Sequence, residues 1–424
     1  MARTKSLEVR LWGEVVGYLA EDPPGVIRFE YDESFRQKKL EIAPIEMPLA
    51  TTNIYEPRNI SSTFRGLPGI IADCLPDRFG MRAIETFFTK HYQRKRDDIG
   101  VLDKLLYVGD RAIGALEFAP AIETNLNSDD YLNLQDLVTA AKQLVEGKAE
   151  KVPLEILRMS ASPGGRVAKA LVDYSPSNNQ LRSGFAEPKA GFIPCLLKFD
   201  GVSDGDPANE YGRLEYVYSK LASLCNIDMP NTYLIEGETP QGPGAHFLVE
   251  RFDRNERKEK LYHYASLCGL YVRDFIEKHS CTYEEYLRLV QSLCKNQQEV
   301  EEAFRRMLFN LMFRNQDDHT KNLGFCMDES GTWRLAPAFD LNYVNSLSGV
   351  AATHQMTLNG KDCDFEFTDL LQAGKYVGIP RSKVKRFIEQ FSNAANQFMR
   401  LAEESGLKES HAKGIRSRFL EFNL

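Results

Sequence analysis

The stretch FRNQDDHTKNLGF, residues 313–325, places two carboxylates, a histidine, a lysine and an asparagine within six residues of each other. It follows VEEAFRRMLFNLMFRN (300–315), whose apolar residues form one helical stripe: Val300, Ala303, Phe304, Met307, Leu308, Leu311 and Met312. After it, LGFCMD, the turn ESGT and WRLAPAFDL are typical of a β-hairpin. The polar cluster is therefore expected on a loop between a rigid helix and a hairpin, where catalytic groups are commonly displayed.

The residue types in this loop suit phosphoryl transfer. That reaction needs a carboxylate to orient a hydroxyl, oxygen ligands for Mg²⁺ and a lysine on the nucleotide phosphates. The spacing from Asp317 to Asn322 matches the catalytic loop of protein kinases, and Asp340 in AFDL corresponds to their later metal-binding aspartate. The preceding His-Arg of kinases is absent, since Asn315 and Gln316 stand there. The alternative interpretation is a solvated helix end with capping side chains.

Two upstream segments offer the remaining parts of such a site. Lys198 at the end of a short apolar strand is placed to bind phosphates, with either Glu210 or Glu215 as its partner. It also fits an edge-strand lysine that discourages aggregation. The segment SASPGGRVAK (160–169) offers glycines, hydroxyls and basic groups for phosphate, although such a segment also fits an ordinary turn.

The rest of the chain alternates between sheet and helix. Residues 7–30 show the alternation of a small antiparallel sheet, and 70–92 predict short helices interrupted at Pro76. Leu134, Leu137, Val138 and Ala141 share one face of a helix that ends at Gly147. Residues 156–174 are expected to form strand, Gly loop and strand in an antiparallel sheet with one helix over 214–227, and helices dominate from about 264.

Composition restricts the classes of function. The 424 residues carry a formal charge of −7, so the whole molecule has no general electrostatic reason to bind nucleic acid. The eight cysteines include no C-x-x-C pair, which favours reduced thiols in the cytosol over a disulfide framework or a metal clamp. No apolar run is long enough to cross a membrane. We therefore expect a soluble cytoplasmic protein with no membrane contact.

Several separated motifs resemble the HipA family, the serine/threonine kinase toxins of bacterial type II toxin–antitoxin systems. DDHTKNL (317–323) with PAFDL (337–341) is similar to the catalytic and metal-binding motifs of that family. LVERFDR (248–254) looks like its hinge segment, and GLPGIIADCLPDRFG (66–80) resembles the signature of its N-terminal domain. Together these motifs span most of the chain.

The resemblance implies an α+β, bilobal protein-kinase-like (HipA-like) fold with a β-rich N-terminal domain and a helical C-lobe. We expect the N-terminal domain at 1–125, a kinase N-lobe with Gly loop and hinge at 126–253, and a helical C-lobe with the catalytic loop at 254–424. ATP and Mg²⁺ are the implied cofactors. Protein hydroxyls of serine or threonine are the implied acceptors.

The resemblance also implies roles for individual residues. Asp317 would be the catalytic base, with Lys198 as the phosphate lysine and Asn322 and Asp340 as the Mg²⁺ ligands. The cofactor would further contact residues of the Gly loop, the hinge and the catalytic loop: Ser162, Gly164, Gly165, Lys169, Glu250, Phe252, Asp253, His319 and Lys321. Asp318, a second acid beside the base, and the PGG sequence of the Gly loop are the departures from familiar patterns.

Regulation and partners follow from the same resemblance. Inhibitory autophosphorylation would fall on Ser162, with Ser160 as the local alternative, because a phosphate there repels the ATP phosphates. A small helix-turn-helix antitoxin of the HipB type is the implied partner, and DNA would be reached mainly through it. The competing interpretations are a small-molecule or lipid kinase, and a non-catalytic protein that binds an antitoxin as corepressor.

Overall fold

The first part of the chain forms an antiparallel sheet with the strand order β4-β3-β2-β1-β5. The computed structural model describes residues 3–57, 61–122, 131–148, 152–153, 157, 159, 167–203, 210–345 and 352–423. The strands of this sheet are β1 (Ser6–Leu11), β2 (Glu14–Glu21), β3 (Ile27–Tyr31), β4 (Ile54–Tyr55) and β5 (Leu116–Ala119). Because β1 pairs antiparallel with β2 and β2 with β3, the sheet expected over 7–30 is confirmed.

The helical segments of this part of the chain lie between β3 and β5 in the sequence. They are α1 (Glu33–Gln37), α2 (Gly69–Ala72), α3 (Arg78–Tyr92), η1 (Arg96–Asp98) and α4 (Val101–Val108). The interruption expected at Pro76 separates α2 from α3, because Pro lacks an N–H for a helix interior. Asp77 then begins α3 as its N-cap, with Oδ1 accepting a hydrogen bond from the Gly80 N–H at 2.8 Å.

A second antiparallel sheet has the order β10-β11-β9-β7-β8-β6. Its strands are β6 (Tyr131–Leu132), β7 (Val167–Ser175), β8 (Gln180–Ser183), β9 (Ile193–Ser203), β10 (Thr232–Thr239) and β11 (Gly242–Glu250). Helices α5 (Leu134–Val145) and α7 (Tyr211–Leu224) accompany it. Both helices were expected, and Gly147 just beyond α5 has the positive φ of +75° that a helix-terminating glycine adopts.

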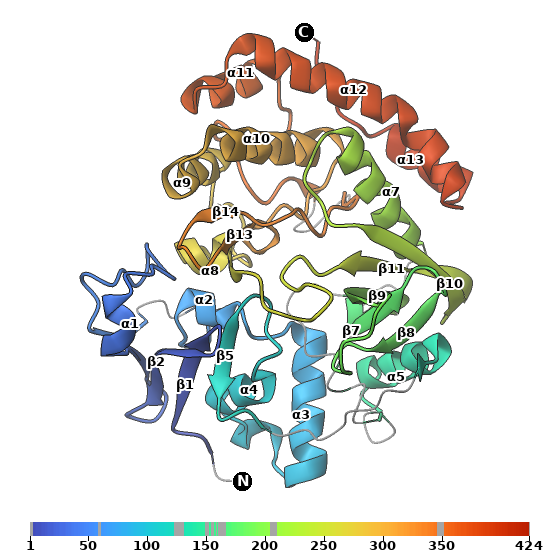
Figure 1. Cartoon of the computed structure of the whole chain (residues 1–424). Coiled ribbons are helices and arrows are strands. Elements are labelled where there is room, and N and C mark those ends of the chain that lie inside the picture. Colours follow the sequence, from blue (N-terminus) through green and yellow to red (C-terminus); the bar gives the residue numbers. More distant parts are fainter. Residues whose placement is uncertain are drawn as a thin grey trace.

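Helices dominate the last part of the chain and form the upper layer in Figure 1, with the two large sheets below them. They are α8 (Leu267–Tyr271), α9 (Tyr283–Cys294), α10 (Gln297–Met312), η3 (Thr320–Asn322), α11 (Phe367–Tyr376), α12 (Arg381–Glu404) and α13 (Glu409–Arg416). The expected hairpin is β13 (Gly324–Met327) with β14 (Trp333–Leu335), and β12 (His263–Ser266) adds a third strand. No helix among the described residues is long and apolar enough to span a membrane.

The bilobal α+β architecture expected from the sequence is confirmed, but one strand prediction is wrong. Among the described residues of that segment, Leu157 and Met159 are helical where a strand was expected. A short apolar run cannot be assigned to strand or helix by its periodicity alone. The expected boundary near 125 lies outside the described residues, and the division into 1–125, 126–253 and 254–424 stays a prediction.

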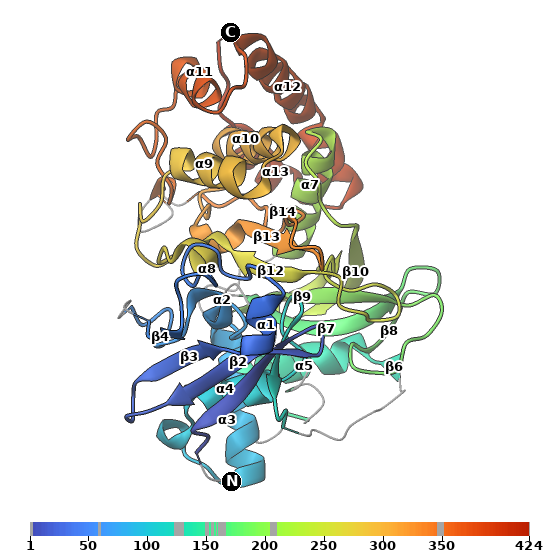
Figure 2. The same ribbon diagram turned by 60° about the vertical axis from the view of Figure 1, so that its left-hand side comes forward.

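The N-terminal part packs directly on the helical part, as the rotated view in Figure 2 shows for α2 beside α8 and β12. Fully buried Asp73 accepts hydrogen bonds from the N–H and hydroxyl of Ser266 at 2.7 and 2.8 Å. The Thr63 hydroxyl donates to Asp274 at 2.7 Å. The His263 ring contacts the Ile42 carbonyl through Nε2 at 3.0 Å. These long-range bonds fix the first sheet against β12 and α8.

His263 is expected to make stability depend on pH. Burial lowers the pKa of His263 to about 4, so the unfolded chain binds more protons between roughly pH 6.5 and pH 4. Its contribution to stability is present above pH 6.5 and is lost as pH falls toward 4, in total about 3 kcal/mol. His263→Gln, which can still donate to Ile42, is expected to reduce the difference between unfolding free energies measured in urea at pH 7 and pH 4.5. The exposed-site control His91→Gln should leave that difference as in the wild type, and an equal reduction in both variants would contradict the assignment.

Candidate active site

Lys198 lies at the centre of the candidate active site. It is in β9, and its Nζ is 2.5 Å from Oε1 of Glu215 on α7 and also bonds Oδ1 of Asp340, which follows β14. The side chains of Lys198 and Glu215 are 11% and 9% exposed. Of the two acids left open by the sequence, Glu215 is therefore the partner. Glu210 instead accepts hydrogen bonds from the Lys408 N–H and His411 near the C-terminus.

The electrostatics of this trio follow from two carboxylates sharing one ammonium group. Burial opposes the charge on Lys198, but Asp340 and Glu215 outweigh it and raise the pKa of the lysine. Burial likewise opposes ionisation of Asp340, yet Lys198 and Lys169 hold its pKa at about 2. Burial raises the pKa of Glu215, despite Lys198. The two lysines thus favour the ionised form of Asp340, as a cation ligand requires.

The backbone at Asp340 is in the left-handed region, with φ of +53°. Aspartate tolerates this region better than most residues, and such conformations occur often where a side chain must be aimed at a functional site. The ring of Phe339 stacks on Phe252 at a centroid distance of 6.5 Å. The turn at 339–340 therefore directs the Phe339 side chain against Phe252 and the Asp340 side chain toward Lys198.

The two neighbouring acids of the loop at 317–322 have different environments. The Asp317 side chain is 51% exposed, with Oδ1 3.6 Å from His319 Nε2. The Asn322 side-chain amide donates to the Asp317 carbonyl at 2.9 Å, which ties the two ends of the loop together and leaves the amide oxygen of Asn322 as its ligand atom. The solvent-facing carboxylate of Asp317 can approach a hydroxyl substrate.

Asp318 holds the loop in place. Its buried carboxylate accepts hydrogen bonds from the Tyr283 hydroxyl at 2.6 Å and the Gln355 N–H at 2.7 Å, and it pairs with His354 Nδ1 at 2.8 Å. Burial acts to raise the pKa of Asp318, but His354 and these hydrogen bonds lower it. Sequence reasoning missed this positioning role, because its partners are 35 or more residues away.

Lys169 and Lys321 both face acids of the N-terminal part. Lys169 on β7 lies directly opposite Lys198 in the strand register, and its Nζ is 3.0 Å from Oδ2 of Asp77. Lys321 packs its ammonium over the Phe275 ring at 5.3 Å, and its charge opposes the burial that raises the pKa of Asp77. Asp77 was not singled out from the sequence, although it lies within the motif at 66–80.

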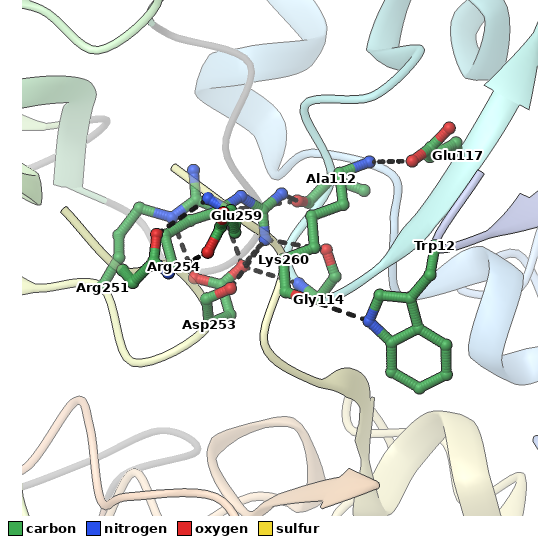
Figure 3. Close-up of polar contacts among 10 residues, drawn as sticks. Trp12, Ala112, Gly114, Glu117, Arg251, Asp253, Arg254, Glu259 and Lys260 are labelled. Atoms are coloured by element: carbon green, nitrogen blue, oxygen red, sulfur yellow. Dashed lines mark hydrogen bonds and ion pairs between the residues drawn. The ribbon is translucent and has the colours of Figure 1, made fainter. Parts of the chain in front are cut away.

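The hinge segment is bound to the N-terminal part, as Figure 3 shows. Asp253 is 1% exposed and accepts from Arg251 at 2.6 Å, Arg254 at 2.8 Å and the Gly114 N–H at 2.7 Å. These bonds hold the pKa of Asp253 far below its usual range although burial opposes this. Lys260 adds an ion pair to Glu117 at 2.6 Å. The carboxylate of Asp253 is thus engaged within the protein, and its contact with the cofactor stays a prediction.

Glu250 and the residues of the Gly loop are the remaining predicted site residues. Glu250, at the end of β11, accepts from the Tyr233 hydroxyl at 2.5 Å and from Asn231 at 3.0 Å. The Gly-loop residues Ser160, Ser162, Gly164 and Gly165 lie outside the described residues.

The donor set fits a magnesium ion that is shared with a nucleotide. Among the described residues no three His, Cys, Asp or Glu side chains gather as a metal cage. One carboxylate from Asp340 and one amide oxygen from Asn322 are hard oxygen donors, and Mg²⁺ is commonly held by one or two such groups while waters and phosphates complete its shell. The residues present therefore fit Mg²⁺ bound together with ATP.

Comparison with known proteins gives two family matches. Residues 7–119 match the model of the HipA N-terminal domain, and residues 161–399 match that of the HipA-like C-terminal domain. A curated relative from Haemophilus influenzae, described as a putative kinase, is 26% identical over 182 residues, which are 38% of this chain. The match spans 52% of that relative, so the chain covers about half of its length.

One solved structure of a HipA complex agrees with the family assignment at the level of the fold. A chain in the complex of Shewanella oneidensis MR-1 HipA, HipB and operator DNA superposes with a TM-score of 0.66 and 16% identity, over 97% of this chain and 95% of that one. The Helicobacter pylori proinflammatory kinase CtkA superposes with a TM-score of 0.35 and 12% identity, over 59% of this chain and 93% of that one. Since the C-terminal model alone covers more than half of the sequence, the chain belongs to the HipA family.

Proposed function

We propose that this protein is an ATP-dependent serine/threonine protein kinase that acts as a HipA-type toxin. The observation that carries the proposal is the contact of Lys198 with both Glu215 and Asp340. A strand lysine, a helix acid and an acid after the catalytic hairpin are the parts that phosphoryl transfer requires. They come from segments up to 142 residues apart, so local folding alone does not account for their meeting.

The chain's own residues supply positioning and proton handling. Asp317 accepts the proton of the attacking hydroxyl, because it is the exposed acid of the loop, and His319 lies beside it. Asp340 and Asn322 would hold Mg²⁺, and Lys198 would contact the nucleotide phosphates. Bound MgATP supplies the γ-phosphoryl group and neutralises the charge that develops on its oxygens.

The partners and regulation that we propose come from the family. The Shewanella HipA structure is a complex with HipB and operator DNA, which supports a HipB-like helix-turn-helix antitoxin as partner here. The formal charge of −7 favours contact with DNA through that antitoxin over direct binding by the whole molecule. Cytoplasmic location and inhibitory autophosphorylation at Ser162, or Ser160, belong to the same proposal.

The test is transfer of labelled γ-phosphate from ATP with Mg²⁺, together with the dissociation constant for MgATP. Wild type is expected to label itself in the Gly loop, and Lys198→Met to bind MgATP at least about 10-fold more weakly because it lacks the phosphate cation. Lys220→Met is the matched control, since Lys220 lies on neighbouring α7 and its ammonium contacts Thr232 and the Tyr216 ring.

The other results identify the alternatives. Transfer to lipid or small molecules without protein labelling would replace the protein-kinase assignment by a lipid or small-molecule kinase. Absence of MgATP binding in the wild type would favour a non-catalytic role in antitoxin binding.

A further inference from the structure

The N-terminal part contributes a buried ion pair to the candidate active site. Asp77 lies at the start of α3, and its Oδ2 is 3.0 Å from Nζ of Lys169 on β7. The two side chains are only 6% and 3% exposed, so solvent screens the pair weakly. Breaking such a pair by removing one partner leaves an uncompensated charge in the interior.

Lys169 occupies the same level of the sheet as the candidate phosphate lysine. It is paired in register with Lys198 on the adjacent strand β9. Residues directly opposite each other in an antiparallel pair point to the same face of the sheet, so the side chains of Lys169 and Lys198 leave the sheet on the same side. Lys169 therefore lies beside the lysine that bonds Glu215 and Asp340.

Asp77 separates the roles of these two lysines. With Asp77 present, Lys169 has its own carboxylate, and Glu215 and Asp340 are left to Lys198 and a metal ion. Without it, Lys169 would turn toward Glu215 and Asp340, where it would compete with Lys198 and with Mg²⁺. Asp77 is thus the carboxylate partner of Lys169, as Glu215 is the carboxylate partner of Lys198.

We propose that Asp77 is a positioning residue of the nucleotide site, through which the N-terminal domain holds Lys169 for the ATP phosphates. This inference rests on the proposed kinase function. Asp77 contacts no substrate itself and acts through Lys169. The nucleotide site is consequently complete only when the N-terminal domain is docked.

Because the two carboxylate oxygens of Asp77 have different partners, a substitution can remove the negative charge and still keep the cap of α3. Oδ1 of Asp77 caps α3 through the Gly80 N–H, while Oδ2 makes the ion pair. Asparagine and serine cap helices about as well as aspartate, so Asp77→Asn and Asp77→Ser keep the cap and lose the charge. Asp77→Glu keeps the charge. Asp32→Asn is the matched control, because Asp32 caps α1 through Ser34 and is not paired with any lysine in the described structure.

The experiment measures binding of a fluorescent ATP analogue with Mg²⁺ to the full chain, displaced by MgATP. Asp77→Asn is expected to raise the dissociation constant for MgATP about 10-fold, Asp77→Glu less than 3-fold, and Asp32→Asn less than 2-fold. In a Lys169→Met background, Asp77→Asn should change it less than 2-fold. Circular dichroism confirms that each variant is folded, and Asp77→Ser replaces Asp77→Asn if the latter is unstable.

The possible outcomes separate this inference from the proposed function. If wild type binds MgATP and transfers phosphate while Asp77→Asn does so equally well, the positioning role is wrong and the kinase function stands. An equal loss in the Lys169→Met background would also overturn it, because Asp77 would then not act through Lys169. If wild type does not bind MgATP, both the function and the inference fail.

Discussion

Asp317→Asn is expected to lower the rate of phosphoryl transfer by about 10³-fold. The substitution keeps the shape of the side chain but removes the only half-exposed carboxylate of the loop, which is the proposed acceptor of the hydroxyl proton. The dissociation constant for MgATP should change less than 3-fold, because the proposed nucleotide contacts are made by other residues. Single-turnover transfer of labelled phosphate, measured beside MgATP binding, tests both expectations.

Asp364→Asn is the control for this variant, because it removes an exposed acid elsewhere in the helical part. It should transfer phosphate at the wild-type rate. If Asp317→Asn retained that rate as well, Asp317 would not be the base. A loss of MgATP binding equal to the loss of rate would instead assign Asp317 to the nucleotide or metal.

Gly69→Ala is expected to destabilise the fold by about 3 kcal/mol, because it inserts a methyl group where two backbones touch. A Cβ on Gly69 would lie 2.1 Å from the Gly269 carbonyl oxygen, and a Cβ on Gly269 would lie 2.2 Å from Asp73 Oδ2. The atoms that the added methyl group would contact belong to the backbone of α8, which cannot move away as a flexible side chain could. Urea unfolding followed by circular dichroism gives the change in free energy.

Gly414→Ala is the matched substitution for comparison. Gly414 lies in α13 without positive φ, and a Cβ there meets nothing within 4 Å. Alanine should therefore be neutral or stabilise by up to about 1 kcal/mol through helix propensity. Equal stability of Gly69→Ala and wild type would mean that α2 and α8 separate easily, which would contradict the close packing of the two parts.

The sequence by itself determined the elements whose signals are local. The stripe of α10 is buried from Val300 to Met312, and the hairpin of β13 and β14 follows the polar loop as expected. Such elements follow from periodicity and turn chemistry within a few residues. The motifs around Asp317 and Asp340 also identified the family, and its models match the chain. The roles of these residues stay predictions.

Other assignments of secondary structure and of side-chain partners could be made only from the folded chain. Leu157 and Met159 are helical where a strand was expected, since a short apolar run fits both. The choice between Glu210 and Glu215 depended on tertiary packing, because Glu210 precedes α7 and contacts Lys408 and His411, whereas Glu215 within α7 meets Lys198 on β9. Asp318 carries the same side chain as Asp317, and only the packing of Tyr283 and His354 makes it a buried anchor.

The contacts that the N-terminal part makes with the rest of the chain were decided entirely by tertiary structure. In the sequence, Asp73 and Asp77 are two acids of one short motif. In the fold, Asp73 bonds Ser266 and Asp77 pairs with Lys169. The physical reason is that the energy of a buried hydrogen bond or ion pair depends on its partner and its burial. The partners of Asp73 and Asp77 lie about 90 to 190 residues away in the sequence. The hydrogen bond and the ion pair therefore form only once the sheets and helices have packed together.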